Sequence, residues 1–169
     1  DCTIRRERGL PGPRDRAGSC WGVSITRARV AQAGRVAEVL ASAMHRDPLS
    51  VHFFPDPRHR RRALEAMYDL VARVAVRSGA AWVSSPAVEG VALWEMPGRS
   101  TLRARHLSLP RVARFLRVAG IARAAALGRY ESWAAGCFHR HVPRGSAHLL
   151  LLAVDPSQPA RQRAASAVR

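Results

Sequence analysis

Apolar residues recur along the chain with a spacing that changes from segment to segment, and each spacing predicts an element. Residues 23–26 alternate between apolar and polar side chains, as a half-buried strand does. From Val36 to Met44 the apolar spacing becomes helical. Asp47 and Pro48 end that helix, because the residue before a proline is pushed out of the α region. The sequence therefore predicts a strand followed by a helix.

A second helix is predicted to begin at Asp56 and Pro57. Asp56 can cap the helix through its side chain, and the proline after it fits the first helical turn. The apolar positions from Leu64 to Ala75 then keep to one face, which is typical of an amphipathic helix packed on a core. Gly79 closes the helix.

Two strand-like runs and two helical runs come next. Residues 81–84 and 90–95 are predicted to form strands, and residues 85–89 between them contain a proline and favour a hairpin. Helical spacing covers 110–127, with arginines on the outward face, and again 130–141. The pattern therefore predicts two more helices before the last strand.

The last apolar run, residues 149–154, does not alternate at all. Such runs are typical of a strand in the middle of a sheet with both faces covered, and we expect this position here. The elements together predict an α/β (α+β) fold, with a mostly antiparallel sheet and flanking helices over residues 21–157. Residues 1–20, which lack a hydrophobic period, are predicted to form a disordered basic leader, and 158–169 an Arg/Ala-rich tail.

Charge adds a competing hypothesis. The 169 residues include 28 basic and 12 acidic ones, for a formal net charge of +16, and such an excess attracts polyanions. A small basic nucleic-acid-binding module is therefore the alternative. Against it, every basic residue is arginine, the arginines are spread along the chain, and aromatic residues do not alternate with them as in single-strand binders. We therefore do not expect nucleic acid as the partner.

The cysteines and the apolar runs bear on the compartment. The three cysteines include no CxxC pair, so neither a disulfide framework nor a zinc ribbon is predicted. No apolar stretch is long enough for a signal-peptide core or a membrane span. We expect a cytoplasmic protein without membrane contact.

Five segments within residues 24–157 follow one another in an order and with gaps that can be compared with those of known families. They are Ala43–Pro48, Phe53–Pro57, Arg60–Arg62, Gly90–Trp94 and Leu149–Pro156. In this arrangement the chain resembles a bacterial N-acetyltransferase of the GNAT superfamily. The resemblance implies acetyl-CoA as cofactor and acetyl transfer to a small-molecule or peptide amine.

The resemblance also implies where the cofactor lies. In this family the fourth strand parts from the fifth, and the pantetheine arm of acetyl-CoA lies along the peptide groups left unpaired. By this resemblance Leu152, Ala153 and Val154 contact acetyl-CoA through main-chain atoms, which can stabilise charge developing on the thioester oxygen. From the run alone, a plain core strand remains the simpler interpretation.

The sequence departs from the family directly after this strand. The family continues with a glycine-rich turn whose N–H groups hold pyrophosphate. The three corresponding positions fall on Pro159, Gln162 and Ala164, and only Ala164 fits. Pro159 has no N–H, and Gln162 carries a side chain where glycine lets phosphate approach. We therefore predict an incomplete acetyltransferase domain with impaired binding and no turnover, as a frame change near residue 158 would produce.

Candidate catalytic residues are few. Glu95 and Glu131 suit a general base by residue type, although exposed glutamates more often only solvate a surface. No catalytic residue is assigned from the sequence. Cys137 and His141 share a helical face at metal-ligand spacing, but no further ligand cluster supports a metal, and packing of Cys137 beside Trp133 in the core is the favoured interpretation.

Overall fold

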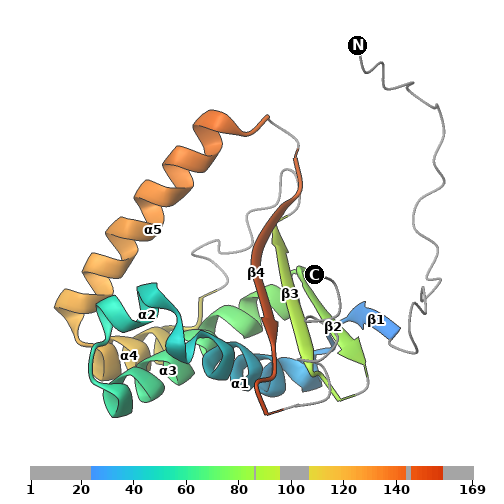
Figure 1. Ribbon diagram of the computed structural model, residues 1–169, viewed down its shortest axis with the longest axis horizontal. Coiled ribbons are helices and arrows are strands. Elements are labelled where there is room, and N and C mark those ends of the chain that lie inside the picture. The colour runs from blue at the N-terminus through green and yellow to red at the C-terminus, as the bar shows by residue number, and fades with distance from the viewer. Residues whose placement is uncertain (1–23, 86, 96–106, 144–145, 158–169) are drawn as a thin grey trace, which may run out of the picture.

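The computed structural model describes residues 24–85, 87–95, 107–143 and 146–157. In this part of the chain a four-stranded sheet lies against a layer of helices, and one long helix extends away from that layer (Figure 1). The predicted α+β class is confirmed. The elements in chain order are β1 (Ser24–Arg27), a short 3-10 helix (Val30–Gln32), α1 (Ala33–Ala43), a second 3-10 helix (Met44–Arg46), α2 (Pro48–Phe53), α3 (Pro57–Arg77), β2 (Ala81–Ser85), β3 (Gly90–Glu95), α4 (Leu109–Ala119), α5 (Ile121–His141) and β4 (His148–Val154).

The described sheet has the order β1-β2-β3-β4, and every pairing in it is antiparallel. The predicted hairpin of β2 and β3 is confirmed. α1 to α3 connect β1 to β2, whereas α4 and α5 connect β3 to β4. In the register, Val83 lies opposite Val91, which lies opposite Ala153 on β4. These three residues form a row across the strands, and their buried side chains face the layer of helices.

Asp47 separates two helices, as its position before a proline predicts. A short helix, α2, also begins at this residue, and the sequence pattern did not predict it. The Asp47 carboxylate accepts hydrogen bonds from the backbone N–H groups of Leu49 and Ser50, at 3.0 and 3.2 Å. Pro48 occupies the first turn, where its missing N–H costs nothing. The same two residues thus end one helix and start the next.

α3 begins and ends where the sequence predicts. The Asp56 side chain accepts a hydrogen bond from the N–H of His59 at 2.6 Å, and Gly79 follows the helix with a φ of 72°. Near its start, the buried Arg60 donates to the carbonyl oxygen of Phe54 at 2.9 Å. These bonds hold the connection between α2 and α3 in place.

The helical region after β3 divides differently from the prediction. Instead of helices over 110–127 and 130–141, α4 ends at Ala119 and α5 begins at Ile121. Gly120 lies between them with a φ of 84°, a backbone conformation open to glycine but strained for other residues. Gly128, which falls between the two predicted helices, lies inside α5.

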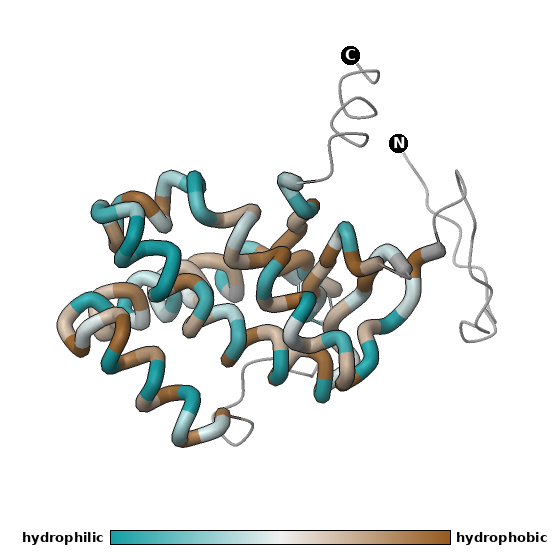
Figure 2. The backbone as a smooth tube through the Cα atoms, turned by 90° about the horizontal axis from the view of Figure 1, so that it is seen from below, coloured by the Kyte–Doolittle hydropathy of each residue, from teal (hydrophilic) through white to brown (hydrophobic). Residues whose placement is uncertain are grey.

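The core lies on one side of the sheet. α1 packs against β3 and β4, and α3 packs against β2. In Figure 2 hydrophobic and hydrophilic residues alternate along these helices, as expected for helices with one buried face. The largest fully buried side chains come from α1, the connection after α2, α3 and the sheet, and they are Phe54, Leu40, Leu64, Leu93, Val36, Val39, Val74, Val83 and Val91.

β4 does not occupy the place predicted for it. Among the described residues it pairs with β3 alone and forms an edge of the sheet. Its side chains alternate in exposure: Ala153 is 3% exposed, while Leu152 and Val154 are 64% and 49% exposed. The prediction of a central strand covered on both faces is therefore wrong for the described residues. Continuous apolarity indicated burial, but only one face of this strand packs against helices.

Candidate functional site

The outer edge of β4 presents main-chain groups in a defined order. The N–H of Asp155 donates to the carbonyl of Glu89 at 2.7 Å, and the β3–β4 register places these two residues opposite each other. In an antiparallel ladder, pairs that exchange hydrogen bonds alternate with pairs that do not. The pair Val91–Ala153 therefore falls at a hydrogen-bonding position, whereas Leu152 and Val154 do not.

The main-chain groups of the three strand residues expected at the cofactor thus point in two opposite directions. The N–H and C=O groups of Ala153 turn toward β3, and those of Leu152 and Val154 turn toward the outer edge. Gly90, opposite Val154, agrees with this arrangement, since its N–H donates to Ser84 Oγ of β2 at 2.7 Å and so turns away from β4. Within the described part of the chain, no strand pairs with this outer edge.

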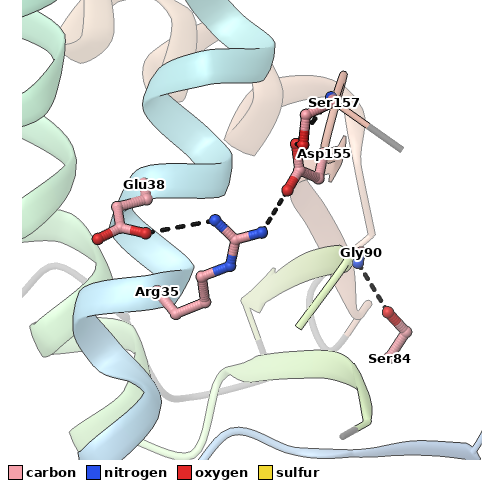
Figure 3. A network of polar contacts seen from close by, with 6 residues as sticks. All are labelled: Arg35, Glu38, Ser84, Gly90, Asp155 and Ser157. Carbon is pink, nitrogen blue, oxygen red and sulfur yellow. Dashed lines mark hydrogen bonds and ion pairs between the residues drawn. The ribbon is translucent and has the colours of Figure 1, made fainter. Parts of the chain in front are cut away.

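A buried carboxylate fixes the end of β4 to α1. Asp155 accepts hydrogen bonds from the N–H and the hydroxyl of Ser157, at 2.9 and 2.7 Å, and forms an ion pair with Arg35 (Figure 3). Arg35 also reaches Glu38 one turn further along α1, at 3.3 Å. The bonds from Ser157, followed by that from Arg35, lower the pKa of the Asp155 carboxyl below its ordinary value. The strand edge is therefore held at the position where the chain leaves the sheet.

A cavity of about 580 Å³ lies beside this strand, between α2, α3, α5 and β4. Its volume is within the range of small-molecule sites. Leu150 and Leu151 of β4 line it, so the cavity reaches to within one residue of the outward-facing Leu152. The lining residues are Met44, Asp47, Leu49, Ser50, Phe53, Phe54, Leu64, Met67, Tyr68, Val71, Leu93, Leu127, Tyr130, Glu131, Ala134, Leu150 and Leu151.

Two aromatic contacts hold α5 over the cavity. Near its middle, the rings of Tyr130 and Phe53 of α2 meet edge to face, with centroids 6.1 Å apart. Near its end, the ring of Phe138 stacks on His148 at the start of β4, with centroids 3.7 Å apart. Because α5 is held at both places, Leu127, Ala134 and the exposed Glu131 form one wall of the cavity.

Four ionisable side chains line the cavity: Asp47, Tyr68, Tyr130 and Glu131. Tyr68 of α3 is 6% exposed, and burial, reinforced by the charges of Asp47 and Glu131, raises the pKa of its hydroxyl. Desolvation also raises the pKa of the Glu131 carboxyl. The Asp47 carboxylate uses one oxygen to cap α2, as described above. The cavity is thus apolar with a small acidic region, a combination suited to a ligand with an apolar body and a positive charge.

The sequence-based candidates have different locations. Glu131 lines the cavity, whereas Glu95 lies at the end of β3 with its carboxylate 3.9 Å from His148. Ala164, Pro159 and Gln162 lie outside the described residues, as do the predicted leader and tail. Nothing in the sequence pattern marked Tyr68 as a site residue, because it occupies an ordinary position on the apolar face of α3.

The helix that carries Cys137 is less buried than predicted. Trp133, expected to pack in the core beside Cys137, is 63% exposed. Cys137 itself is half-buried, and its carbonyl oxygen contacts His141 Nδ1 at 2.8 Å, an ordinary helical i,i+4 contact. In the described ranges no three His, Cys, Asp or Glu side chains gather as a metal site requires.

No protein-family model matches the chain, and no curated protein matches it significantly. Of the helices described, none has the length and apolar character needed to cross a bilayer. The function is therefore inferred from the edge of β4 and the cavity beside it.

Proposed function

We propose that this chain is an acetyl-CoA-dependent N-acetyltransferase domain of the GNAT type, acting on an amine in the cytoplasm. The observation that carries the proposal is the outer edge of β4, where the peptide groups of Leu152 and Val154 face away from β3 beside a cavity of ligand size. A pantetheine arm carries amide groups that can pair with such an edge as a strand does.

The cofactor and the cavity have complementary tasks in this proposal. When bound, acetyl-CoA supplies the acetyl group: the amine nitrogen bonds to the thioester carbon, and the carbon–sulfur bond breaks to release a thiolate. The outward N–H groups of β4 can hold the thioester oxygen as charge develops on it. The ammonium loses one proton before its nitrogen attacks and a second as the amide forms; a base takes one and the thiolate takes the other.

The residues after β4 weaken the proposed activity. Pro159 and Gln162 stand where the family resemblance implies pyrophosphate-binding positions, and their side chains suit that task poorly. Binding of acetyl-CoA should therefore depend on the pantetheine arm alone. We expect a dissociation constant on the order of 1 mM and no measurable turnover.

This proposal can be tested with two ligands that differ only in the nucleotide. Acetyl-CoA and S-acetylpantetheine, which lacks the phosphates, are titrated separately into ¹⁵N-labelled protein. We expect similar affinities for both, with the amide resonances of Leu152 and Val154 shifting more than that of Ala153. The Leu152→Pro variant removes one outward N–H without breaking a ladder bond and should weaken binding severalfold, whereas Leu152→Ala retains the N–H.

The outcomes separate the parts of the proposal. Micromolar affinity for acetyl-CoA with far weaker binding of S-acetylpantetheine would contradict the impaired pyrophosphate contact. If neither ligand shifts the Leu152 or Val154 amide at concentrations up to about 10 mM, the site along β4 is disproved. Circular dichroism of the Leu152→Pro variant checks that the fold is retained.

A further inference from the structure

The charge of the cavity is opposite to that of the chain. The protein carries 28 basic and 12 acidic residues, yet no arginine or histidine lines the cavity among the described residues, while Asp47 and Glu131 both do. A cavity of this kind attracts cations and disfavours carboxylates and phosphates, since like charges repel. The acidic region thus indicates the sign of the ligand.

Tyr68 is a second, independent indication of a ligand. Its side chain lines the cavity, is more than nine-tenths buried, and has no hydrogen-bond partner within the described residues. The hydroxyl oxygen is not among the fully buried polar atoms of this part of the chain that lack a partner, which are Arg60 Nε and His148 Nδ1, so it is open to the cavity. A ligand N–H or a water in the cavity would supply the missing partner.

The remaining walls describe the body of the ligand. Phe53 and Tyr130 contribute two aromatic rings in contact with each other, and the other walls are mostly aliphatic side chains. Aromatic faces attract cations and also pack against flat apolar groups. The cavity is large enough for one ring with a short side chain, or for an aliphatic group of similar size.

We propose that this cavity binds a primary ammonium carried on an aromatic or compact aliphatic body, with the cation at the carboxylates of Asp47 and Glu131. The body packs against Phe53 and Leu127, and the ammonium or a bound water donates to the Tyr68 hydroxyl. This inference deepens the proposed function and rests on it only for the acetyl transfer after binding. In that transfer, the Glu131 carboxylate is placed to accept the first proton from the ammonium.

The geometry supports Glu131 rather than Asp47 in that task. Asp47 already accepts two backbone hydrogen bonds, which hold its carboxylate at the start of α2. Glu131 is an exposed residue at the rim of the cavity and forms no hydrogen bond or ion pair with another described residue. Partial desolvation raises the pKa of its carboxyl, so it binds a proton more readily. A carboxylate that is unpaired and partly desolvated suits general-base work.

The test compares an amine with a neutral compound of the same shape. 2-Phenylethylamine and 2-phenylethanol are titrated by calorimetry into the full chain at neutral pH, without acetyl-CoA. We expect the amine to bind about two- to fivefold more tightly than the alcohol, the gain typical of a partly exposed ion pair. The Glu131→Gln variant should lose that difference while it binds the alcohol as before.

Two variants complete the experiment. Glu65→Gln is the matched control, because Glu65 lies outside this cavity and pairs with Arg61 at 3.1 Å on the surface of α3, so binding of the amine should not change. Ala134→Trp places a large ring on the cavity wall formed by α5 and should abolish binding of both compounds. Circular dichroism confirms that each variant is folded.

Each result decides the inference. Equal binding of amine and alcohol, an unchanged amine affinity in Glu131→Gln, or an equal loss in Glu65→Gln would overturn it. The proposed function fails separately, because the thioester titration observes the β4 amides and needs no amine. Amine binding without a thioester response would leave a cation-binding cavity in a protein that is not an acetyltransferase.

Discussion

At the scale of single residues, Asp155 links the sequence motif to the fold. Its position after the apolar run marks the end of β4, and its buried carboxylate receives hydrogen bonds from Ser157 and an ion pair from Arg35 of α1. Arg35 and Asp155 are 120 positions apart in the chain, so no local pattern could have predicted their contact. The motif predicts the turn, but the fold determines the partner.

Replacing Asp155 with asparagine should destabilise the protein by about 1–3 kcal/mol, because hydrogen bonds to a charged group are lost and the new amide N–H₂ faces the guanidinium. Since the folded-state pKa of Asp155 is lowered, its stabilisation is full above the unfolded pKa and is lost as pH falls through the folded pKa. Urea unfolding across an acid pH series should therefore show a smaller loss for Asp155→Asn than for the wild type.

The control for this experiment is the other partner of Arg35. Glu38 is mostly exposed, so Glu38→Gln should change the free energy of unfolding by less than about 0.5 kcal/mol. If Glu38→Gln and Asp155→Asn destabilise the protein equally, Asp155 does not anchor β4.

The candidate site was only partly predictable at this scale. The resemblance indicated Leu152, Ala153 and Val154, and residue type indicated Glu131. Which peptide groups face outward depends on the β3–β4 register, which the sequence does not contain. Tyr68 escaped notice because its spacing on α3 is that of a core residue, and only the neighbouring helices show that it borders a cavity.

At the scale of elements, Gly120 determines how the two helices after β3 are divided. Its φ of 84° lets α4 end and α5 depart in a new direction, and a Cβ at this position would meet nothing within 4 Å. The backbone conformation, rather than crowding, is therefore the reason for glycine here. Glycine at this position therefore lets α5 take its direction over the cavity without backbone strain.

We expect Gly120→Ala to destabilise the protein by about 1–3 kcal/mol, the cost of a non-glycine residue in a sparsely populated backbone region. Gly128→Ala is the matched control, because Gly128 lies within α5 with open space around it, and alanine there should stabilise by about 0.5–1 kcal/mol. Guanidinium unfolding measures both changes. Equal effects of the two substitutions would show that the break at Gly120 is not required.

The elements themselves were largely predictable, and the exceptions have physical causes. Capping signals at Asp56 and the closing Gly79 predicted α3 correctly, because these effects are local. α2 was missed because its six residues are too few to show a period. Gly120 was not recognised as a break because the apolar spacing continues across it, and periodicity does not report backbone direction.

At the scale of the whole molecule, basic residues far outnumber the acidic residues that could pair with them. Asp69 forms ion pairs with Arg73 and Arg111 and so fastens α4 to α3, at 2.8 and 3.1 Å. These contacts use few of the arginines, and the formal net charge is +16. Self-repulsion of this size destabilises the compact state, and dissolved salt screens it.

The melting temperature should therefore rise by a few degrees, roughly 2–5 °C, when sodium chloride is raised from about 20 to 500 mM. Differential scanning calorimetry at neutral pH measures this change. A fall in melting temperature would mean that screening of attractive pairs such as Asp69–Arg73 outweighs the relief of repulsion.

The open edge of the sheet at β4 also affects self-association of the protein. Within the described residues, the outer edge of β4 beside Leu152 and Val154 has main-chain donors and acceptors that pair with no other strand, and such an edge is a template for intermolecular β-pairing. Concentrated protein should accordingly tend to self-associate through this strand and, at the extreme, to aggregate. A small molecule bound along this edge would block the pairing between copies and so keep the protein in solution.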